Sequence, residues 1–225
     1  MKYVNFVKYG DLDRIAAARE AHFAYADRLR EQGELAIGGP LLDEQGRRTG
    51  LLFIYEAASR DAALAFARDD PFTLADAVSS YEVTEWRLRG VNLDLLTRAN
   101  RSGDHGESPV RLFANHAKYG ADEAKLEAAR PAHWAYDQRL ERAEKVALAG
   151  PFANDEGGLF VYHAHDRAEA LTFVEQDPFA LEGVYAGYEL VEWVVEGVNT
   201  ALLSSDFRVS LSRSRFPSLQ HPSVR

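Results

Sequence analysis

The chain contains two copies of one pattern, and this repetition constrains its fold more than any other feature. Three motifs occur twice in the same order: Arg-x-x-His-x-x-Tyr at 19–25 and 130–136, Gly-Pro at 39–40 and 150–151, and Asp-Pro-Phe at 70–72 and 177–179. The shift is 111 residues for the first two motifs and 107 for the third, so four residues are lost after Gly-Pro. Surface loops tolerate such deletions. A period this long indicates a duplicated small domain and not a solenoid of short repeats.

Each copy predicts the element order βαββαβ. In the first copy, strands are expected at 3–9, 35–38, 51–56 and 81–88, and helices at 13–32 and 60–68. Apolar residues recur at steps of three and four along the first helix, which Gly33 ends. Ser59 is expected to cap the second helix, and Asp70 before Pro71 to stop it, because a residue before proline avoids the helical region. This order is the split, ferredoxin-like arrangement, an antiparallel four-stranded sheet with both helices on one face.

The other face of each sheet would carry Val4, Phe6 or their neighbours. A domain of about one hundred residues does not leave that much apolar surface in water. Packing the two sheets face to face removes the problem within one chain. We therefore predict an α+β fold in which two ferredoxin-like βαββαβ repeats form an intramolecular pseudo-dimer, with the helices outside.

The predicted domains span 1–97 and 110–203. Residues 98–109 between them are polar, contain Gly and Ser, and show no period, which is typical of a linker. Residues 204–225 form a tail rich in Ser and Arg. Two interpretations of the tail stay open: a weakly ordered segment, or a strap that lies across the domains or a partner chain.

The composition excludes several classes of protein. Hydrophobic residues make up 46% of the chain, which is enough for a folded core. With 26 Lys and Arg against 35 Asp and Glu, the net charge of −9 argues against a nucleic-acid partner. The absence of cysteine removes disulfides, thiolate metal sites and cysteine nucleophiles.

The first residues do not resemble a signal peptide, and no apolar run reaches the roughly 18 residues of a spanning helix, so we expect a cytoplasmic protein without a membrane partner.

One helix face in each copy carries polar residues of unusual kinds. Arg19, His22 and Tyr25 lie three residues apart and therefore share a face. The second copy repeats this face with Arg130, His133 and Tyr136. Burying a guanidinium requires compensation, so the face favours a polar pocket; a satisfied core histidine is the other interpretation. Pro131 is expected to start the helix of the second copy, with residues 122–129 forming a separate turn or a kinked segment.

Asp70 and Asp177 are the other polar residues that both copies retain. Each precedes a proline at the point where the second helix of its copy ends. One interpretation is a structural aspartate at a helix terminus. The other is a carboxylate that hydrogen-bonds the histidine, fixes its tautomer and leaves the second ring nitrogen as a general acid or base.

In this order, Arg-x-x-His, Gly-Pro and Asp-Pro-Phe resemble the YciI-like (YCII-related) family of the dimeric α+β barrel superfamily. The resemblance covers about residues 2–88 and 110–195. It implies a small enzyme with a His–Asp pair in a pocket, and one branch is similar to chlorohydroxyhydroquinone dehydrochlorinases, which eliminate HCl from an aromatic intermediate. Carried over to this sequence, the resemblance implies two catalytic pairs, His22 with Asp70 and His133 with Asp177.

The two pockets are expected to differ. Tyr185 follows the Asp-Pro motif of the second copy in the way the family does, whereas the first copy has Val78 there. A tyrosine adds a hydrogen-bond donor that stays protonated at neutral pH. We therefore expect the His133 pocket to be the better-equipped catalytic site, with the His22 pocket less active or serving as a binding site.

Other signals are weaker. His163 and His165 would share one strand face near His116, but neither cysteine nor an acidic cluster accompanies them, so no metal site is predicted. No glycine-rich phosphate loop follows a strand, and no Gly-x-Ser-x-Gly motif occurs. We expect no cofactor.

The leading functional hypothesis is a cofactor-independent lyase or isomerase that acts on a small cyclic or aromatic oxygenated metabolite. The histidine would move a proton, and Arg19 or Arg130 would hold a phenolate, enolate or carboxylate. The tyrosines predicted to contact the substrate are Tyr25, Tyr136 and Tyr185. The alternatives are a non-catalytic small-molecule-binding module and a structural barrel with degenerate sites. A small molecule is the expected partner, and assembly into a homo-oligomer is left open.

Overall fold

The computed structural model describes residues 1–100 and 110–204. The first half contains β1 (Lys2–Tyr9), α1 (Leu12–Glu31), β2 (Leu35–Leu42), β3 (Arg48–Glu56), α2 (Arg60–Arg68), α3 (Pro71–Leu74) and β4 (Val78–Trp86), followed by β5 (Gly90–Val91) and α4 (Leu93–Ala99). The second half contains β6 (Leu112–Tyr119), α5 (Glu123–Arg142), β7 (Val146–Pro151), β8 (Gly157–His163), α6 (Arg167–Glu175), α7 (Pro178–Leu181), β9 (Tyr185–Trp193) and β10 (Glu196–Val198). The predicted βαββαβ order is confirmed in both halves. The predicted linker falls outside the described residues from 101 onward, as does the predicted tail from 205 onward.

Side chains at the helix ends explain where the first-half helices begin. Asp11 caps α1, and Ser59 caps α2 as predicted, its hydroxyl accepting from the Ala62 backbone at 3.2 Å. The Asp-Pro pair does stop α2, but it also starts the short helix α3, which the sequence analysis did not predict. Proline is favourable in the first turn of a helix because its missing N–H has no intrahelical partner there, and Asp70 supplies the cap.

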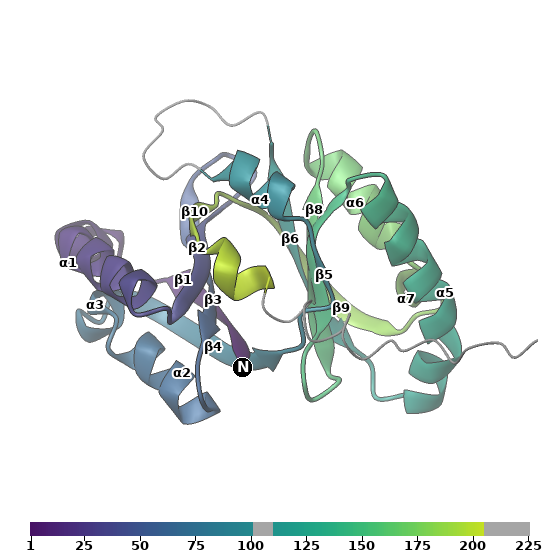
Figure 1. Ribbon diagram of the computed structural model, residues 1–225, viewed down its shortest axis with the longest axis horizontal. Coiled ribbons are helices and arrows are strands. Elements are labelled where there is room, and N and C mark those ends of the chain that lie inside the picture. Colours follow the sequence, from purple (N-terminus) through teal and green to yellow (C-terminus); the bar gives the residue numbers. More distant parts are fainter. Residues whose placement is uncertain (101–109, 205–225) are drawn as a thin grey trace, which may run out of the picture.

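The strand order within each half is that of a ferredoxin-like sheet. It runs β4-β1-β3-β2 in the first half and β9-β6-β8-β7 in the second, with antiparallel pairing throughout. The sheets are joined along both of their edges, because Leu41 of β2 pairs with Trp193 of β9, and Trp86 of β4 forms a bridge with Phe152 after β7. Figure 1 shows the sheets facing each other, with α1–α3 and α5–α7 on the two outer sides. The predicted pseudo-dimer is confirmed.

The Gly-Pro motif of each half binds the arm that follows the last strand of the other half. β5 pairs with β7, and β10 pairs with β2. The indole of Trp86 donates to the carbonyl of Gly150 at 2.8 Å, and the indole of Trp193 donates to the carbonyl of Gly39 at 3.2 Å. A Cβ on Gly39 would lie 1.9 Å from the carbonyl oxygen of Val194, so this position must be glycine. The retained Gly-Pro and Trp residues therefore hold the two halves together.

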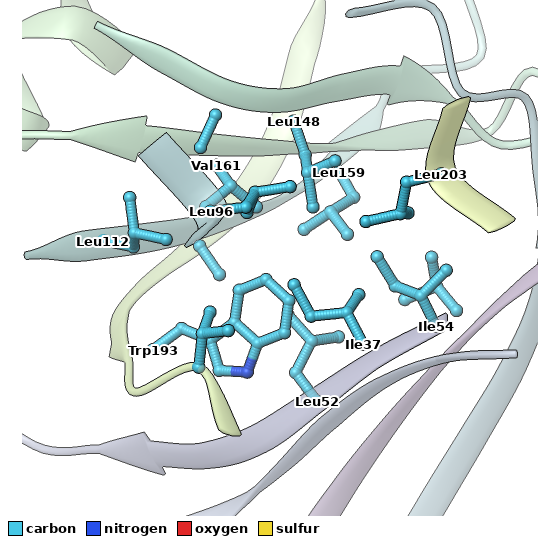
Figure 2. Packing of buried hydrophobic residues seen from close by; sticks show 14 of the residues in the cluster. Ile37, Leu52, Ile54, Leu96, Leu112, Leu148, Leu159, Val161, Trp193 and Leu203 are labelled. Carbon is cyan, nitrogen blue, oxygen red and sulfur yellow. The ribbon is translucent and has the colours of Figure 1, made fainter. Parts of the chain in front are cut away.

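The largest hydrophobic core fills the space between the two sheets. Figure 2 shows side chains from both halves meeting there, among them Ile37 and Ile54 from the first half and Leu148 and Trp193 from the second. Leu96 of α4 and Leu203 near the end of the described chain also reach this core. Burying a leucine-sized side chain contributes about 1.5–3 kcal/mol, so a half on its own would lose a large part of its stability.

A second apolar layer separates each sheet from its helices. In the first half, Tyr3 and Phe53 on the strands pack with Ile15 and Leu29 of α1. Phe113 and Phe160 hold the corresponding positions in the second half. Among the described residues, no helix is both long enough and apolar enough to cross a membrane.

The prediction that Pro131 starts a helix is wrong. α5 is continuous from Glu123 to Arg142 with Pro131 inside it. Proline removes one helical hydrogen bond and crowds the preceding turn. Leu126 and Ala129 before the proline, and His133 and Tyr136 after it, are all buried, so packing along one face keeps the two parts in one helix.

Candidate active site

His22 and Asp70 form a buried hydrogen-bonded pair, which we call the first dyad. Nδ1 of His22 lies 2.9 and 3.0 Å from the two carboxylate oxygens of Asp70. Because a carboxylate accepts, Nδ1 carries a proton, and in the neutral imidazole the lone pair is therefore on Nε2. The backbone N–H of Phe72 donates to the same carboxylate at 2.9 Å. Both interpretations of the aspartate therefore hold together: it caps α3 and it orients the imidazole.

The first dyad borders a cavity of about 320 Å³. Its aromatic lining comes from Tyr9, Phe23, Phe53 and Phe72, and the Phe72 ring stacks on the His22 imidazole at 4.0 Å between ring centres. Burial raises the pKa of Tyr9 to about 12, so its hydroxyl stays protonated. Within the described residues, Nε2 of His22 forms no hydrogen bond. A ligand in this cavity can therefore exchange a proton with it.

The same cavity is rich in positive charge. It is lined by Arg19, Arg30, Arg47 and Arg48, against the single carboxylate of Glu196. Arg47 pairs with Asp43, Arg48 lies 3.6 Å from Glu196, and Arg30 pairs with Asp27. Arg19 is exposed at the cavity and forms no ion pair or hydrogen bond within the described part of the chain. An anionic group on a ligand would find its most available partner in Arg19.

His133 and Asp177 form the second dyad with nearly the same geometry. The Nδ1 distances to the carboxylate oxygens are 2.8 and 3.0 Å, and the backbone N–H of Phe179 donates to the carboxylate at 2.9 Å. Phe179 stacks on the imidazole at 3.9 Å, as Phe72 does in the first half. The repeated motifs thus build the same histidine–aspartate pair twice.

Nε2 of His133 is not free. It lies 3.2 Å from a carboxylate oxygen of Asp137, one helical turn further along α5. Burial raises the pKa of Asp137 to about 7; His133 opposes this increase, and the nearby Asp177 carboxylate adds to it. A protonated Asp137 would place its acidic hydrogen next to Nε2. The first half has Ala26 at the equivalent position. His133, Asp137 and Asp177 also lie close enough together to hold a metal ion, a group that the sequence analysis did not anticipate.

Arg130 and Tyr185 are also engaged by neighbours. Two guanidinium nitrogens of Arg130 donate to Glu127, at 3.1 and 2.6 Å. The Tyr185 hydroxyl donates to Asp177 at 2.8 Å, so its proton is held by the dyad carboxylate. His133 lines none of the four main cavities of the described residues, although Arg130 borders a groove of about 890 Å³. The expectation that the second pocket is better equipped is therefore wrong on geometry.

Tyr25 and Tyr136 also take a structural position. The Tyr25 hydroxyl donates to the carbonyl of Phe66 in α2 at 2.9 Å, and Tyr136 does the same to Phe173 in α6 at 2.9 Å. Neither tyrosine lines any of the four main cavities. Each hydroxyl joins the two long helices of its half, so this geometry does not support the predicted contact of Tyr25 and Tyr136 with a substrate.

The weaker histidine signal does not gather into one site. β8 ends at His163, so His165 lies beyond the strand and beside Asp166. His163 is 3.2 Å from the carbonyl of Glu144. His116 lies instead between the sheets, with its ring stacked on Phe6.

Comparison with known proteins identifies the family of the chain. The family model of the YCII-related domain matches residues 1–87 and 112–194. The chain belongs to this family. Among curated proteins, none matches this YCII-related protein significantly.

Solved structures that resemble this YCII-related protein include several barrels. Chlorite dismutase from Candidatus Nitrospira defluvii is 12% identical, covers 90% of this chain and 94% of its own, and gives a TM-score of 0.54. A heme-binding protein from Thermus thermophilus is 14% identical over 94% of both chains, with a TM-score of 0.52. These two share the fold. The 5-chloro-2-hydroxyhydroquinone dehydrochlorinase from Burkholderia phenoliruptrix, in complex with 2,5-dihydroxybenzoquinone, is 30% identical over 39% of this chain and 94% of its own, with a TM-score of 0.35.

Proposed function

We propose that this protein is an enzyme in which His22, oriented by Asp70, acts as general base and acid on a small, cyclic or aromatic, oxygenated metabolite. The reaction is an elimination or isomerisation that needs no cofactor. One observation carries the proposal: a buried imidazole has one nitrogen fixed by a carboxylate, and its other nitrogen is available beside a cavity. That combination is what a general base requires.

The reaction follows from the position of the lone pair on Nε2. Nε2 takes a proton from a C–H or O–H group of the substrate, and the electron pair left behind forms a new double bond. In an elimination, the leaving group departs with its own electron pair. In an isomerisation, the imidazolium returns the proton to a different atom. The Asp70 carboxylate stabilises the imidazolium while it exists.

Positive charge at the cavity favours a substrate whose oxygen becomes negative. The unpaired guanidinium of Arg19 can hold a phenolate, enolate or carboxylate, and charge that grows during proton removal strengthens this contact. The Phe53 and Phe72 rings offer flat apolar surfaces for a ring of the substrate. The substrate is therefore a small anion with a planar ring.

The second dyad has a supporting role in this proposal. Asp137 occupies the nitrogen that a base would use, Glu127 neutralises Arg130, and the Tyr185 hydroxyl is bound to Asp177. The second half thus keeps the first half folded and supplies Glu196 to the wall of its cavity. Catalysis belongs to the His22 cavity.

The test is turnover by matched variants of the full chain. A panel of hydroxylated quinols and quinones, with and without a ring halogen, is incubated in deuterated water, and NMR follows deuterium incorporation and halide release. His22→Gln should lose at least about 10²-fold in rate. His133→Gln, which changes the same residue type at the equivalent position, should retain activity within a few-fold. Undiminished turnover by His22→Gln would overturn the proposal.

Asp70→Asn tests the orienting role separately. Asparagine also caps helices well, so α3 should stay folded. Its neutral amide cannot stabilise an imidazolium, so kcat should fall about 10²-fold with little change in KM. If kcat falls only to the extent that the folded fraction falls, Asp70 is only a helix cap.

A non-catalytic small-molecule-binding module is the second candidate. The arginine-rich cavity would serve a binding protein equally well. The distinction is measurable: a binding module would take up the anion with the same affinity in His22→Gln, and deuterium would not enter the ligand.

A further inference from the structure

A second cavity lies between the two sheets and shares no lining residue with the His22 cavity. It measures about 350 Å³. α4 and the last helical turn close the opposite end of the barrel, where Asn92 and Asn199 bond to Ala147 and Ala36 near the starts of β7 and β2. The cavity instead reaches Leu41 near the end of β2. This end of the space between the sheets is open.

His116 is at the inner wall of this cavity. Phe6 and His116 occupy equivalent positions in β1 and β6, so they meet near the pseudo-twofold axis that relates the halves. Their rings stack at 4.2 Å with an angle of 7° between the planes. The Phe152 ring meets the imidazole edge-on at 5.4 Å. Phe6 and Val191 join this wall to the hydrophobic core.

The imidazole has hydrogen-bonding capacity that the protein does not use. His116 has no hydrogen bond within the described residues. Burial lowers its pKa, with smaller opposing contributions from Glu82 and Glu189, so the ring is neutral at physiological pH. A neutral imidazole offers one donor and one acceptor. Both are available to a molecule in the cavity.

The mouth of the cavity carries two equivalent lysine–glutamate combinations, and only one of them forms an ion pair. Lys8 pairs with Glu189 at 3.2 Å. The equivalent residues on the other side are Lys118 and Glu82, which also line the cavity. Lys118 and Glu82 make no ion pair within the described residues. One ammonium and one carboxylate are therefore left for a ligand.

We propose that the mouth of the barrel is a binding site for an α-amino acid with an apolar or aromatic side chain. Its carboxylate meets Lys118 and the N–H of His116, and its ammonium group meets Glu82. The side chain lies on the apolar wall of Phe6, Leu41 and Val191. A zwitterion satisfies both free charges at once, whereas a simple acid or amine leaves one of them unpaired. The site is separate from His22 and does not depend on the reaction proposed there.

The probe is L-phenylalanine, titrated calorimetrically into the full chain. Two analogues test the two charged groups separately: 3-phenylpropanoate lacks the ammonium group, and 2-phenylethylamine lacks the carboxylate. L-phenylalanine should bind at least tenfold more tightly than either analogue. Glu82→Gln and Lys118→Met should each weaken it at least tenfold, and both exposed substitutions leave the core untouched.

His116→Phe places at this position the residue found at the equivalent Phe6, and it should abolish measurable binding. Thermal melts of all three variants separate loss of binding from loss of fold. The matched control is His22→Gln, which should bind L-phenylalanine as the unchanged protein does. The proposal is overturned by an absence of saturable binding at millimolar L-phenylalanine. It is equally overturned by binding that His22→Gln removes and His116→Phe preserves.

Discussion

In both halves a histidine of the long helix meets an aspartate that caps a short helix, and a phenylalanine ring stacks on the imidazole. The halves differ in what lies on the other side of the ring. His22 borders a cavity lined by arginines, whereas the second nitrogen of His133 faces the buried carboxyl of Asp137. Both imidazoles are almost fully buried. Two dyads of equal geometry therefore differ in what the second ring nitrogen faces.

The difference arises outside the repeated motifs. Three small first-half residues correspond to polar residues in the second half: Ala16 to Glu127, Ala26 to Asp137, and Val78 to Tyr185. Each of these polar residues contacts a motif residue: Glu127 contacts Arg130, Asp137 contacts His133, and Tyr185 contacts Asp177. The apolar residue at the equivalent first-half position makes no such polar contact. A duplicated site can thus lose its reactivity while every motif residue is retained, because neighbouring groups occupy the functional atoms.

The largest expected difference between the halves is in the histidines themselves. Replacing His22 by glutamine should reduce turnover by about 10²–10⁴-fold, since general acid–base groups contribute that much. His133→Gln should change turnover by no more than a few-fold. The measurement is kcat/KM for the compound identified in the panel, with both variants checked by circular dichroism. Equal losses would mean that the second dyad also works.

Ala26→Asp transfers the second-half arrangement into the first half. Ala26 is buried and lines the cavity beside His22, so a carboxyl there can reach Nε2 as Asp137 does. Turnover should fall about 10²-fold because the base is occupied. Ala24→Asp is the control, since Ala24 is an exposed residue on the same helix. If both aspartate variants keep full activity, blockage of Nε2 does not explain the difference between the halves.

A smaller difference is expected between the two arginines. Arg19→Met removes the guanidinium without an ion-pair partner and should lower kcat/KM for an anionic substrate about tenfold, as expected for the loss of a charged hydrogen bond. Arg130→Met removes a guanidinium already bound to Glu127 and should have little effect. A neutral substrate analogue sharpens the comparison, because its kcat/KM should be insensitive to Arg19→Met.

The fold was predictable because it depends on regular patterns. Alternating apolar residues, caps such as Ser59 and two copies of one motif set predict two sheets that must cover each other. The short helices α3 and α7 were missed, since an Asp-Pro pair both ends one helix and begins the next. The crossing arms β5 and β10 were missed as well, because nothing local to their few residues specifies a partner in the other half.

The histidine–aspartate pairs could be proposed from spacing and resemblance, but their accessibility could not. Asp137 lies one helical turn from His133 in the printed sequence, and the contrast with Ala26 is visible once the copies are aligned. Whether that carboxyl meets Nε2 depends on side-chain directions and burial. The same is true of Tyr25, whose hydroxyl reaches a backbone carbonyl and not the cavity.

The smallest expected difference is in stability, and it depends on pH. Burial raises the pKa of Asp137 in the folded protein to about 7, from an ordinary value of 3.8. Between these two values the folded state binds more protons than the unfolded state, so the contribution of Asp137 to stability is lost as the pH rises from about 4 to about 7. Asp137→Asn supplies a neutral donor to Nε2 at every pH. It should therefore raise the free energy of unfolding at pH 8, where the Asp137 carboxyl is ionised in the folded protein.

At pH 4 the same substitution should change stability little, since the Asp137 carboxyl is then protonated in the folded protein and neutral like the asparagine that replaces it. Urea unfolding at pH 4, 6 and 8 measures this trend. Glu175→Gln serves as the control, because Glu175 is exposed in the same half and its stability change should not vary with pH in this way. If Asp137→Asn destabilises the protein most at pH 8, Asp137 is ionised there and pairs with a charged His133. In that case an ion pair, and not a hydrogen bond from a neutral carboxyl, would join Asp137 to the second dyad.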